Sequence, residues 1–302
     1  MSNDEDGIYN LSESLTRKNV SLNINMTKNK IRYLVGDIRD LSRCEQICQN
    51  IDVIIHAAAM KHVPVCEYNP DEARKTNFLG TKNMINAAIN CKVSKFLFIS
   101  TDKVVNPSSC MGKTKLKAEN AVLNSNLIKK NKKTKFSVIR FGNVIGSRGS
   151  VLPKFLTQIK LNQNLTVTDK KITRFFTTIN LAVKGVLDAI TIMKGGEKFI
   201  IHNMSSLNIY DLAKSLKKYF KYNKKIIITG LRDGEKLYEE LASFKEMQNY
   251  IIKKNLIIIF NKKKNLQNIK SSNNKTYFLN SKNAKLLKEN LILKFLKKSN
   301  LL

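Results

Sequence analysis

The side chains best suited to chemistry in this sequence are Asp102 and Lys103, which follow Thr101 at the end of an apolar run. A carboxyl group and an amine side by side can move protons to and from a bound molecule, and the threonine hydroxyl adds a hydrogen-bonding group. Lys115 lies four residues after Met111, so one helix face is expected to carry both side chains. These residues predict a proton-transfer site at the end of a strand.

Four short apolar runs have the length of β-strands, and stretches with helical spacing lie between them. We predict strands at residues 31–35, 53–56, 96–100 and 136–141, and helices at residues 41–48, 72–89 and 111–127. Unbroken apolar strands that alternate with amphipathic helices indicate a parallel sheet covered on both faces. The predicted fold class is therefore α/β, with a doubly wound, Rossmann-like parallel sheet.

Small and polar residues collect at the carboxyl ends of these predicted strands, at positions 36–37, 56–59, 100–103 and 142–144. In open α/β sheets the ligand crevice lies outside such strand ends. Each cluster alone has an ordinary explanation, because glycine and aspartate are common in turns and alanines allow close packing. Their shared position predicts a single binding site.

The second half of the chain has a less regular pattern, and no proline-rich or glycine-rich linker precedes it. We predict helices at residues 151–160, 180–193, 209–220, 235–242 and 283–295, and strands at residues 165–168, 199–202, 226–229 and 256–260. The expected organisation is a Rossmann-like domain over residues 1–150 and a smaller lobe, mainly residues 151–302, packed over the crevice. Some segments of the second half are expected to return to the first sheet.

The formal charge of +31 could suit a nucleic-acid-binding protein. Lysine supplies the excess and is spread along the chain, whereas arginine, which reads bases and grips phosphates, is scarce. We therefore expect no specific nucleic-acid partner. No apolar run approaches the roughly 20 residues of a membrane-spanning helix, so we expect a cytoplasmic protein without a membrane span.

The cysteines and histidines predict neither disulfides nor a metal site. The five cysteines are odd in number and form no Cys-x-x-Cys pair, which favours reduced thiols. His56, His62 and His202 are scattered, and no two of them have a zinc-like spacing. We therefore expect no bound metal.

Further short motifs follow one another from about residue 36 to residue 240. They include His56-Ala57-Ala58-Ala59-Met60-Lys61-His62, Met111-Gly112-Lys113-Thr114-Lys115, Arg140-Phe141-Gly142-Asn143-Val144, Gly146-Ser147-Arg148-Gly149-Ser150 and Arg232-Asp233-Gly234-Glu235-Lys236. With these motifs the chain resembles the extended short-chain dehydrogenase/reductases, and among them the CapD-like UDP-N-acetylglucosamine 4,6-dehydratases of bacterial polysaccharide biosynthesis. Residues 147–150 resemble the branch that also inverts C5 of the sugar.

The resemblance implies that a nicotinamide cofactor oxidises C4 of the sugar, water is lost across C5 and C6, and hydride returns to C6. It implies that Asp102 is the acid, Lys103 the base, Thr101 a substrate contact near C4, and Lys115 the group that holds the nicotinamide ribose. Met111 stands where most of the superfamily has a tyrosine that exchanges a proton, and it resembles one branch of these dehydratases. For Lys103 to act as a base near neutral pH, its pKa has to fall from about 10.4 by roughly three units. We expect burial beside Lys115 to cause that fall.

The resemblance also implies contacts for a dinucleotide and for a UDP-sugar in the crevice. The expected cofactor contacts are Asp37 and Ile38 at the adenine, Ala57, Ala58 and Ala59 along the cofactor backbone, Asn77 near the nicotinamide half, and Lys115. The expected substrate contacts are Asn143 and Val144 at the nucleotide sugar, Glu235, and the cations Lys61, Arg148, Arg174 and Arg232 around the diphosphate. Taken alone, each cation is more often a solvated surface residue, and Glu235 could equally organise the start of a helix.

No glycine-rich phosphate-binding turn is present in the sequence. A dinucleotide fold normally begins with a strand, a glycine-rich turn and a helix whose N-terminus holds the pyrophosphate. Only Gly7 precedes Gly36, so we expect the first strand, phosphate loop and first helix to be absent and the sheet to be split. We therefore expect weak binding of NADP or NAD.

The expected partners are a UDP-sugar and a second copy or a complete paralogue of the chain. The alternative is a catalytically impaired fragment or a noncatalytic partner of such a paralogue.

Overall fold

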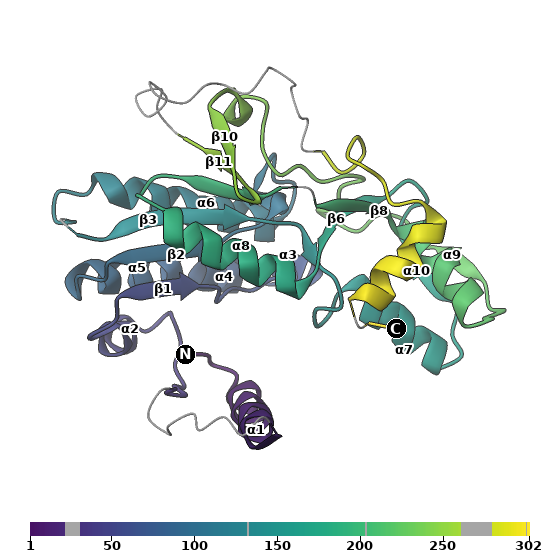
Figure 1. Ribbon diagram of the computed structural model, residues 1–302, viewed down its shortest axis with the longest axis horizontal. Helices are drawn as coiled ribbons and strands as arrows, with labels where there is room; N and C mark the ends of the chain where they lie inside the picture. The colour runs from purple at the N-terminus through teal and green to yellow at the C-terminus, as the bar shows by residue number, and fades with distance from the viewer. Residues whose placement is uncertain (22–30, 132, 203, 261–279, 300) are drawn as a thin grey trace.

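A six-stranded sheet forms the centre of the computed structural model, which describes residues 1–21, 31–131, 133–202, 204–260, 280–299 and 301–302 (Figure 1). In spatial order the strands are β1 (Val53–His56), β2 (Lys95–Ile99), β3 (Lys135–Arg140), β7 (Lys198–Ile201), β11 (Leu256–Ile259) and β10 (Tyr250–Lys253). The first four are parallel, whereas β11 is antiparallel to both of its neighbours. This arrangement confirms the predicted α/β fold with a mainly parallel sheet.

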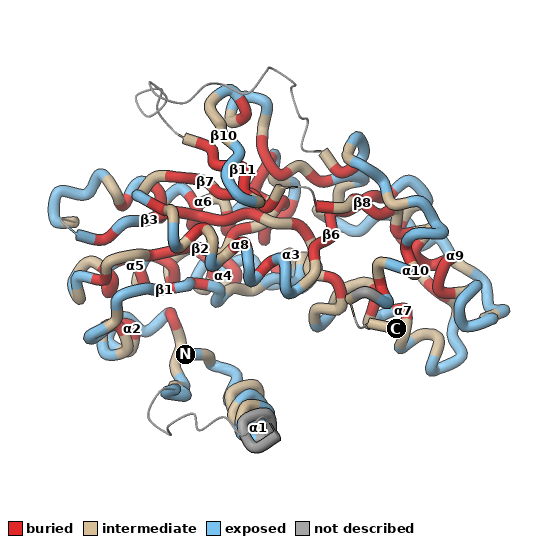
Figure 2. The backbone as a smooth tube through the Cα atoms, viewed as in Figure 1, coloured by how far each residue is buried: buried red, intermediate tan, exposed pale blue. Residues whose placement is uncertain are grey.

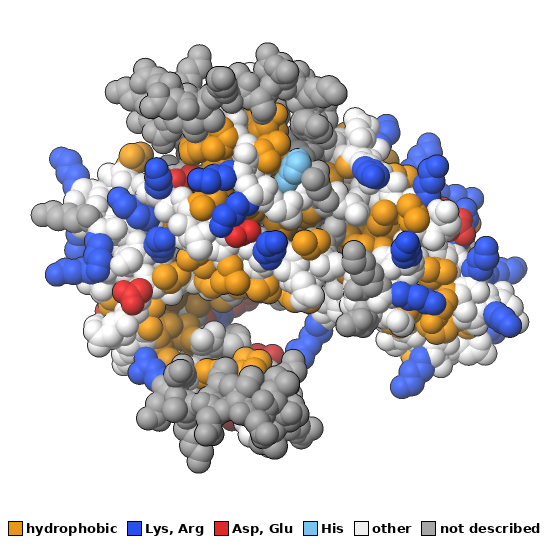
Figure 3. Space-filling model, viewed as in Figure 1, with side chains coloured by type: hydrophobic (Ala, Val, Ile, Leu, Met, Phe, Trp, Pro, Cys, Tyr) orange, Lys and Arg blue, Asp and Glu red, His pale blue; other side chains and the backbone are white. Residues whose placement is uncertain are grey.

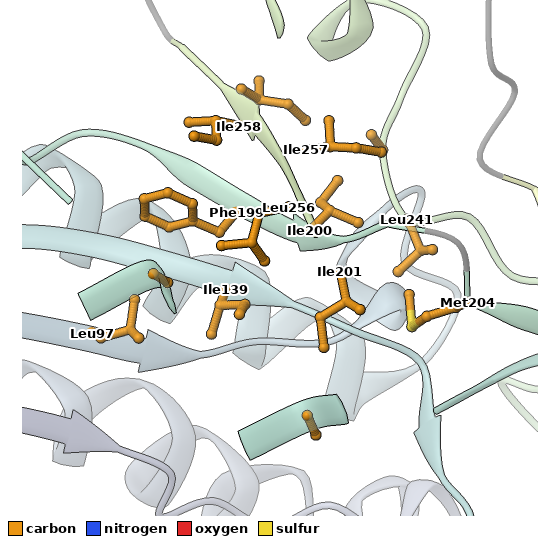
Figure 4. Close-up of a cluster of buried hydrophobic side chains, with 14 of the residues drawn as sticks. Leu97, Ile139, Phe199, Ile200, Ile201, Met204, Leu241, Leu256, Ile257 and Ile258 are labelled. Carbon is orange, nitrogen blue, oxygen red and sulfur yellow. The ribbon is translucent and has the colours of Figure 1, made fainter. Parts of the chain in front are cut away.

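Alternation along β2 shows why both faces of the sheet are covered. Phe96 and Phe98 point to one face and join a buried cluster with side chains of α5 (Thr81–Asn90) and α6 (Cys110–Asn124). Leu97 points to the other face and packs in a cluster with Ile139, Phe199 and side chains of α8 (Ile179–Ile192) (Figure 4). Because successive strand residues face opposite ways, an unbroken apolar run fills two cores at once. Figure 2 shows the buried strands as the continuous centre of the molecule.

The long helix predicted at residues 72–89 forms, but with a change of winding. It consists of α4 (Pro70–Ala73), a π-helical segment η1 (Arg74–Gly80) and α5. Gly80 permits close packing there, because a Cβ atom would lie 2.7 Å from the side chain of Ile38. π-Helical turns are rare and occur frequently at functional sites. The other predicted helices of the first half are present as α2 (Leu41–Cys48) and α6, and α3 (Val63–Tyr68) adds a further one.

The second half builds a smaller lobe and also extends the large sheet. In the lobe, β4 (Asn143–Val144), β6 (Thr173–Thr177) and β8 (Ser205–Asn208) form one sheet, and β5 (Leu165–Val167) pairs with β9 (Ile226–Ile228). Helices α7 (Val151–Lys160), α9 (Ile209–Tyr219) and α10 (Glu289–Lys298) contribute to a separate buried cluster (Figure 1). Since β7, β10 and β11 return to the large sheet, the division at residue 150 stays a prediction.

Residues 31–35 do not form the predicted strand. Their strand-type pairing within the described residues is a parallel bridge between Val35 and Ser2, near the start of helix α1 (Glu5–Ser21). Ser2 N donates to Leu34 O at 3.1 Å, and Gly36 N donates to Ser2 O at 3.0 Å. A strand needs a continuous partner backbone, which these contacts do not provide. Strand β1 is accordingly an edge of the large sheet within the described residues.

One predicted helix is absent and another is shorter than predicted, because their backbones pair with segments distant in the sequence. Residues 235–242 form no helix, since Leu237 O accepts from Thr173 N of β6 and Glu239 O accepts from Ser281 N. The helix predicted at residues 283–295 begins only at Glu289. Just before it, Leu287 N donates to Ser206 O of β8. Helical periodicity in the sequence does not reveal such long-range partners.

Candidate active site

Thr101 and Asp102 lie where β2 ends and the short 3₁₀ turn η2 (Asp102–Val104) begins. The Asp102 side chain is fully buried. Its Oδ1 accepts hydrogen bonds from Thr101 Oγ1 at 2.8 Å and from Lys103 Nζ at 2.9 Å. Its Oδ2 has no hydrogen-bond partner among the described residues, which is rare for a buried carboxyl oxygen. The turn therefore places a carboxyl group behind a hydroxyl and an ammonium group.

Lys103 brings three oxygen-bearing side chains together. In addition to Asp102, its Nζ donates to Asn143 Oδ1 at 3.2 Å and lies 3.8 Å from Glu239 Oε1. The Lys103 side chain is 20% exposed, whereas those of Asp102 and Glu239 are almost entirely buried. Lys103 can thus reach a bound molecule while remaining paired with two carboxyl groups.

Lys115 is a buried lysine at the same strand end. Its Nζ donates to Ile99 O at 2.7 Å and lies 4.2 Å from the centroid of the Phe98 ring. Burial lowers the pKa of Lys115 to about 8, although the charge of Glu119 opposes the shift. Burial was expected to act on Lys103, but in the structure it acts on Lys115, whereas Lys103 is partly exposed and ion-paired with Asp102.

A cavity of about 470 Å³ opens at these strand ends. It is lined by Thr101, Lys103, Met111 and Lys115. Met111 and Lys115, which were expected to share one helix face, therefore both border the same cavity. Asp102 is absent from the lining because Thr101 and Lys103 lie in front of it. The geometry brings the five residues predicted as catalytic together, with Asp102 set back from the cavity.

Most of the predicted substrate contacts also line the cavity, and apart from Lys61 they come from the lobe, including its strand β4. Lys61, Asn143, Val144, Arg174, Arg232 and Glu235 all line the cavity. Arg174 is buried, and its Nη2 lies 3.4 Å from Glu235 Oε1.

Arg148 stands apart from the other predicted substrate contacts. Its side chain is 87% exposed and lies 3.6 Å from Asp4, outside the residues that line the cavity. Lys61 Nζ donates to the carbonyl oxygen of Arg148 at 2.6 Å, so it also fixes the neighbouring loop. A role for Arg148 at a diphosphate would require its side chain to turn inward.

The predicted cofactor contacts lie around a second cavity of about 1170 Å³, which meets the first at Ala57, Ala59 and Met60. Asp37, Ile38 and Ala58 also line this cavity. The Arg39 guanidinium, hydrogen-bonded to Asp37, holds the pKa of that carboxyl below its ordinary value.

Asn77 differs from the other predicted cofactor contacts because it is fully buried. Its amide accepts from Met60 N at 2.7 Å, and donates to Met60 O and Thr114 Oγ1, both at 3.1 Å. The Asn77 side chain therefore anchors the loop where the two cavities meet.

The residues present fit the two ends of a nicotinamide dinucleotide better than its middle. The small side chains of Ala57, Ala58 and Ala59 leave open the passage between the cavities, and Lys115 offers a buried amine at the inner end. Asp37 offers a carboxylate at the outer end. The sequence contains no glycine-rich turn that could present backbone N–H groups to the diphosphate between them.

Sequence reasoning missed Glu239 and Glu119. Glu239 lines the first cavity, and Glu119 accepts from Ser100 Oγ at 2.6 Å and from Arg140 beneath the strand end. Glu239 lies four residues after Glu235, inside a segment predicted as a helix, and that prediction gave no reason to turn it toward Lys103. The sequence signal that could have identified Glu239 as a site residue was its position shortly after the motif at residues 232–236.

Comparisons with known proteins show the family to which the chain belongs. The family described as polysaccharide biosynthesis protein matches residues 1–274. A Methanocaldococcus jannaschii protein named as an uncharacterized membrane protein is 45% identical over 279 residues, which cover 90% of this chain and 82% of that protein. In the described part of the present chain, no helix combines the length and apolarity needed to cross a membrane.

An inverting UDP-N-acetylglucosamine 4,6-dehydratase of Campylobacter jejuni is 44% identical over 216 residues, which cover 71% of this chain and 63% of that enzyme. The chain thus spans less than two thirds of that enzyme. The solved structure of Pen from Bacillus thuringiensis superposes with a TM-score of 0.89 and 38% identity, covering 100% of this chain and 88% of that one. The family match over most of the chain, together with these relatives, shows that the chain belongs to the polysaccharide biosynthesis protein family, whose members are CapD-like extended short-chain dehydrogenase/reductases.

Proposed function

We propose that the chain is a nucleotide-sugar 4,6-dehydratase that acts on UDP-N-acetylglucosamine and inverts C5. The observation that carries the proposal is the pairing of Asp102 with Lys103 at a strand end that opens onto a cavity. Arg174 and Arg232 on the opposite wall supply the charge that a UDP diphosphate needs. The similarity to the Campylobacter dehydratase supports the choice of substrate.

In the proposed reaction, a nicotinamide cofactor bound across the two cavities supplies the hydride acceptor and donor. Thr101 contacts the sugar near C4, and Lys115 holds the nicotinamide ribose. Lys103 takes the proton from C5, because a ketone at C4 makes that proton acidic. The C6 hydroxyl leaves as water with a proton from Asp102. Since Asp102 is screened from the cavity, that proton passes through the Thr101 hydroxyl or the Lys103 amine. Hydride then returns to C6, and C5 receives a proton from solvent on the face opposite Lys103, which inverts that carbon.

The direct test is conversion of UDP-N-acetylglucosamine in the presence of millimolar NADP or NAD, followed by mass spectrometry. We expect a product that has lost one water and carries a 4-keto group. Recovery of unchanged substrate at every cofactor concentration would reject the dehydratase and favour the noncatalytic partner, which could still bind a UDP-sugar.

Cofactor affinity gives a separate prediction. We expect residues 1–302 to bind NADP and NAD with dissociation constants of about 1 mM or weaker, equivalent to at most about 4 kcal/mol of binding free energy. The reason is that the diphosphate meets no helix N-terminus with a glycine-rich turn. Isothermal titration calorimetry measures this directly, and micromolar affinity for either dinucleotide would contradict it.

A further inference from the structure

Glu239 occupies an unusual position opposite the catalytic pair. It is 3% exposed, lines the 470 Å³ cavity, and lies within 4 Å of three cations. Its Oε1 is 3.8 Å from Lys103 Nζ and 3.9 Å from Arg174 Nε, and its Oε2 is 3.4 Å from Lys236 Nζ. Within the described chain, Oε2 has no hydrogen-bond partner. The Glu239 carboxylate thus lies near three positive charges, but none of these ion pairs is shorter than 3.4 Å.

The backbone, rather than the carboxylate, fixes the position of Glu239. Glu239 N donates to Ser281 Oγ at 2.9 Å, and Ser281 N donates to Glu239 O at 2.8 Å. Ser281 Oγ also donates to Thr173 O at 3.2 Å on strand β6. The side chain can therefore lose or gain a charged neighbour without moving the segment that carries it.

Arg174 connects Glu239 to the proposed diphosphate position. Its guanidinium is shared between Glu239 and Glu235, and neither ion pair is shorter than 3.4 Å. Together with Arg232 it lines both the 470 Å³ cavity and an adjoining cavity of about 150 Å³. A diphosphate bound between the two arginines would compete for the guanidinium that Glu239 now shares.

We propose that Glu239 is a positioning residue that couples diphosphate binding to the charge of Lys103, an inference that rests on the proposed UDP-sugar substrate. When the diphosphate binds Arg174, the Arg174 guanidinium no longer compensates the negative charge of Glu239. The Glu239 carboxylate then takes up a proton from solvent, forming an O–H bond. Lys103 then keeps Asp102 as its only carboxylate counter-ion. Its ammonium group releases a proton more readily, and the amine becomes available as the base for C5.

The electrostatics of the site support this role. Burial raises the pKa of Glu239 above its ordinary value; the nearby charge of Lys103 opposes that shift, Asp102 reinforces it, and Arg174 and Lys236 also oppose it. The net direction is upward, even with all three cations in place. Withdrawal of Arg174 by a diphosphate removes one of the opposing charges, so proton uptake at Glu239 becomes more favourable.

The test measures the reactivity of the Lys103 amine, which does not depend on turnover or on a bound cofactor. The protein is labelled with trace acetic anhydride between pH 6 and pH 10, and acetylation of the Lys103 peptide is quantified by mass spectrometry. Glu239→Gln removes the charge but keeps the size of the side chain. We expect it to move the midpoint of Lys103 labelling down by about one pH unit, as expected for loss of a nearby opposite charge.

Two further variants separate charge from structure. Glu239→Asp keeps the charge and should keep a midpoint close to that of the wild type. Glu240→Gln is the matched control, because Glu240 accepts from Asn106 and does not line the cavity. An unchanged midpoint in Glu239→Gln, or an equal shift in Glu240→Gln, would overturn the proposal.

UDP is the ligand probe, because it supplies a diphosphate without covering the sugar position. Saturating UDP should lower the labelling midpoint of wild-type Lys103 and should produce no further shift in Glu239→Gln. The proposal is wrong if UDP leaves the wild-type midpoint unchanged or shifts the variant equally. Failure to dehydrate UDP-N-acetylglucosamine while the UDP shift persists would reject only the proposed reaction, whereas dehydration without the shift would reject only the coupling.

Discussion

Replacing Lys103 with methionine is expected to reduce formation of the 4-keto product by about 100- to 10,000-fold, the usual contribution of a general base. Methionine has a similar length but cannot take the C5 proton. The Asp102 carboxyl would also lose the ammonium that lies 2.9 Å from its Oδ1. Single-turnover conversion with millimolar cofactor measures the effect, because it compares chemistry rather than cofactor affinity.

The matched control for this variant is Lys113→Met on helix α6. Lys113 is exposed and does not line the cavity, so its removal should leave the rate within about twofold, as for an ordinary surface substitution. Binding of UDP-N-acetylglucosamine to the Lys103 variant should persist, since Arg174 and Arg232 remain. A Lys103→Met protein that binds substrate and turns it over at the wild-type rate would remove Lys103 from the mechanism.

Replacing Arg140 with methionine is expected to destabilise the protein by about 3–5 kcal/mol, because it leaves a buried carboxylate unpaired. Arg140 Nε donates to Glu119 at 3.0 Å, and both terminal nitrogens donate to Glu246 at 2.9 Å. Glu119 is fully buried, and without Arg140 its ion pair among the described residues is the one with Lys198, at 3.8 Å. Urea unfolding at pH 7 measures the change in the free energy of unfolding.

An exposed ion pair provides the contrast for Arg140→Met. Lys75 lies 2.8 Å from Glu72, but both side chains are more than 40% exposed, so Lys75→Met should cost less than about 1 kcal/mol. Equal losses in the two variants would show that burial of the Arg140 network is not what makes it stabilising.

Acid unfolding should depend on the same network. Burial raises the pKa of Glu246, but the charges and hydrogen bonds of Arg140 and Lys198 outweigh it and hold the pKa at about 2. Because the folded-state pKa lies below the ordinary value, this stabilisation is complete above about pH 4.5 and is lost as the pH falls toward 2. Wild-type stability should therefore drop between pH 5 and pH 2, and Arg140→Met should show a shallower drop in urea titrations across that range.

The parts of the fold that sequence patterns predicted are those specified by local spacing. Strand β2 and helix α6 follow from an apolar run and a 3.6-residue repeat, so the positions of Thr101, Asp102, Lys103 and Lys115 followed as well. The carboxyl ends of parallel strands meet at one edge of a sheet, and the cavity lined by Thr101, Lys103 and Lys115 opens at that edge.

The parts that could not be predicted depend on partners distant in the sequence. Residues 31–35 have the composition of a strand, but their backbone pairing within the described residues is limited to the bridge at Ser2. Residues 235–242 pair with β6 and Ser281 instead of winding into a helix. The second difference turns Glu239 toward Lys103. Desolvation likewise depends on three-dimensional packing, and at the candidate site it lowers the pKa of Lys115.

The central claim is that the Asp102 and Lys103 pair removes water from an oxidised sugar. The most direct measurement is incubation of the protein with UDP-N-acetylglucosamine and millimolar NADP or NAD in D₂O, followed by mass spectrometry and NMR of the product. Because the C5 proton taken by Lys103 is replaced by one from solvent, we predict a dehydrated 4-keto product that carries one deuterium at C5. A C4 epimer that has lost no water, or a 4-keto product without deuterium at C5, would contradict the account.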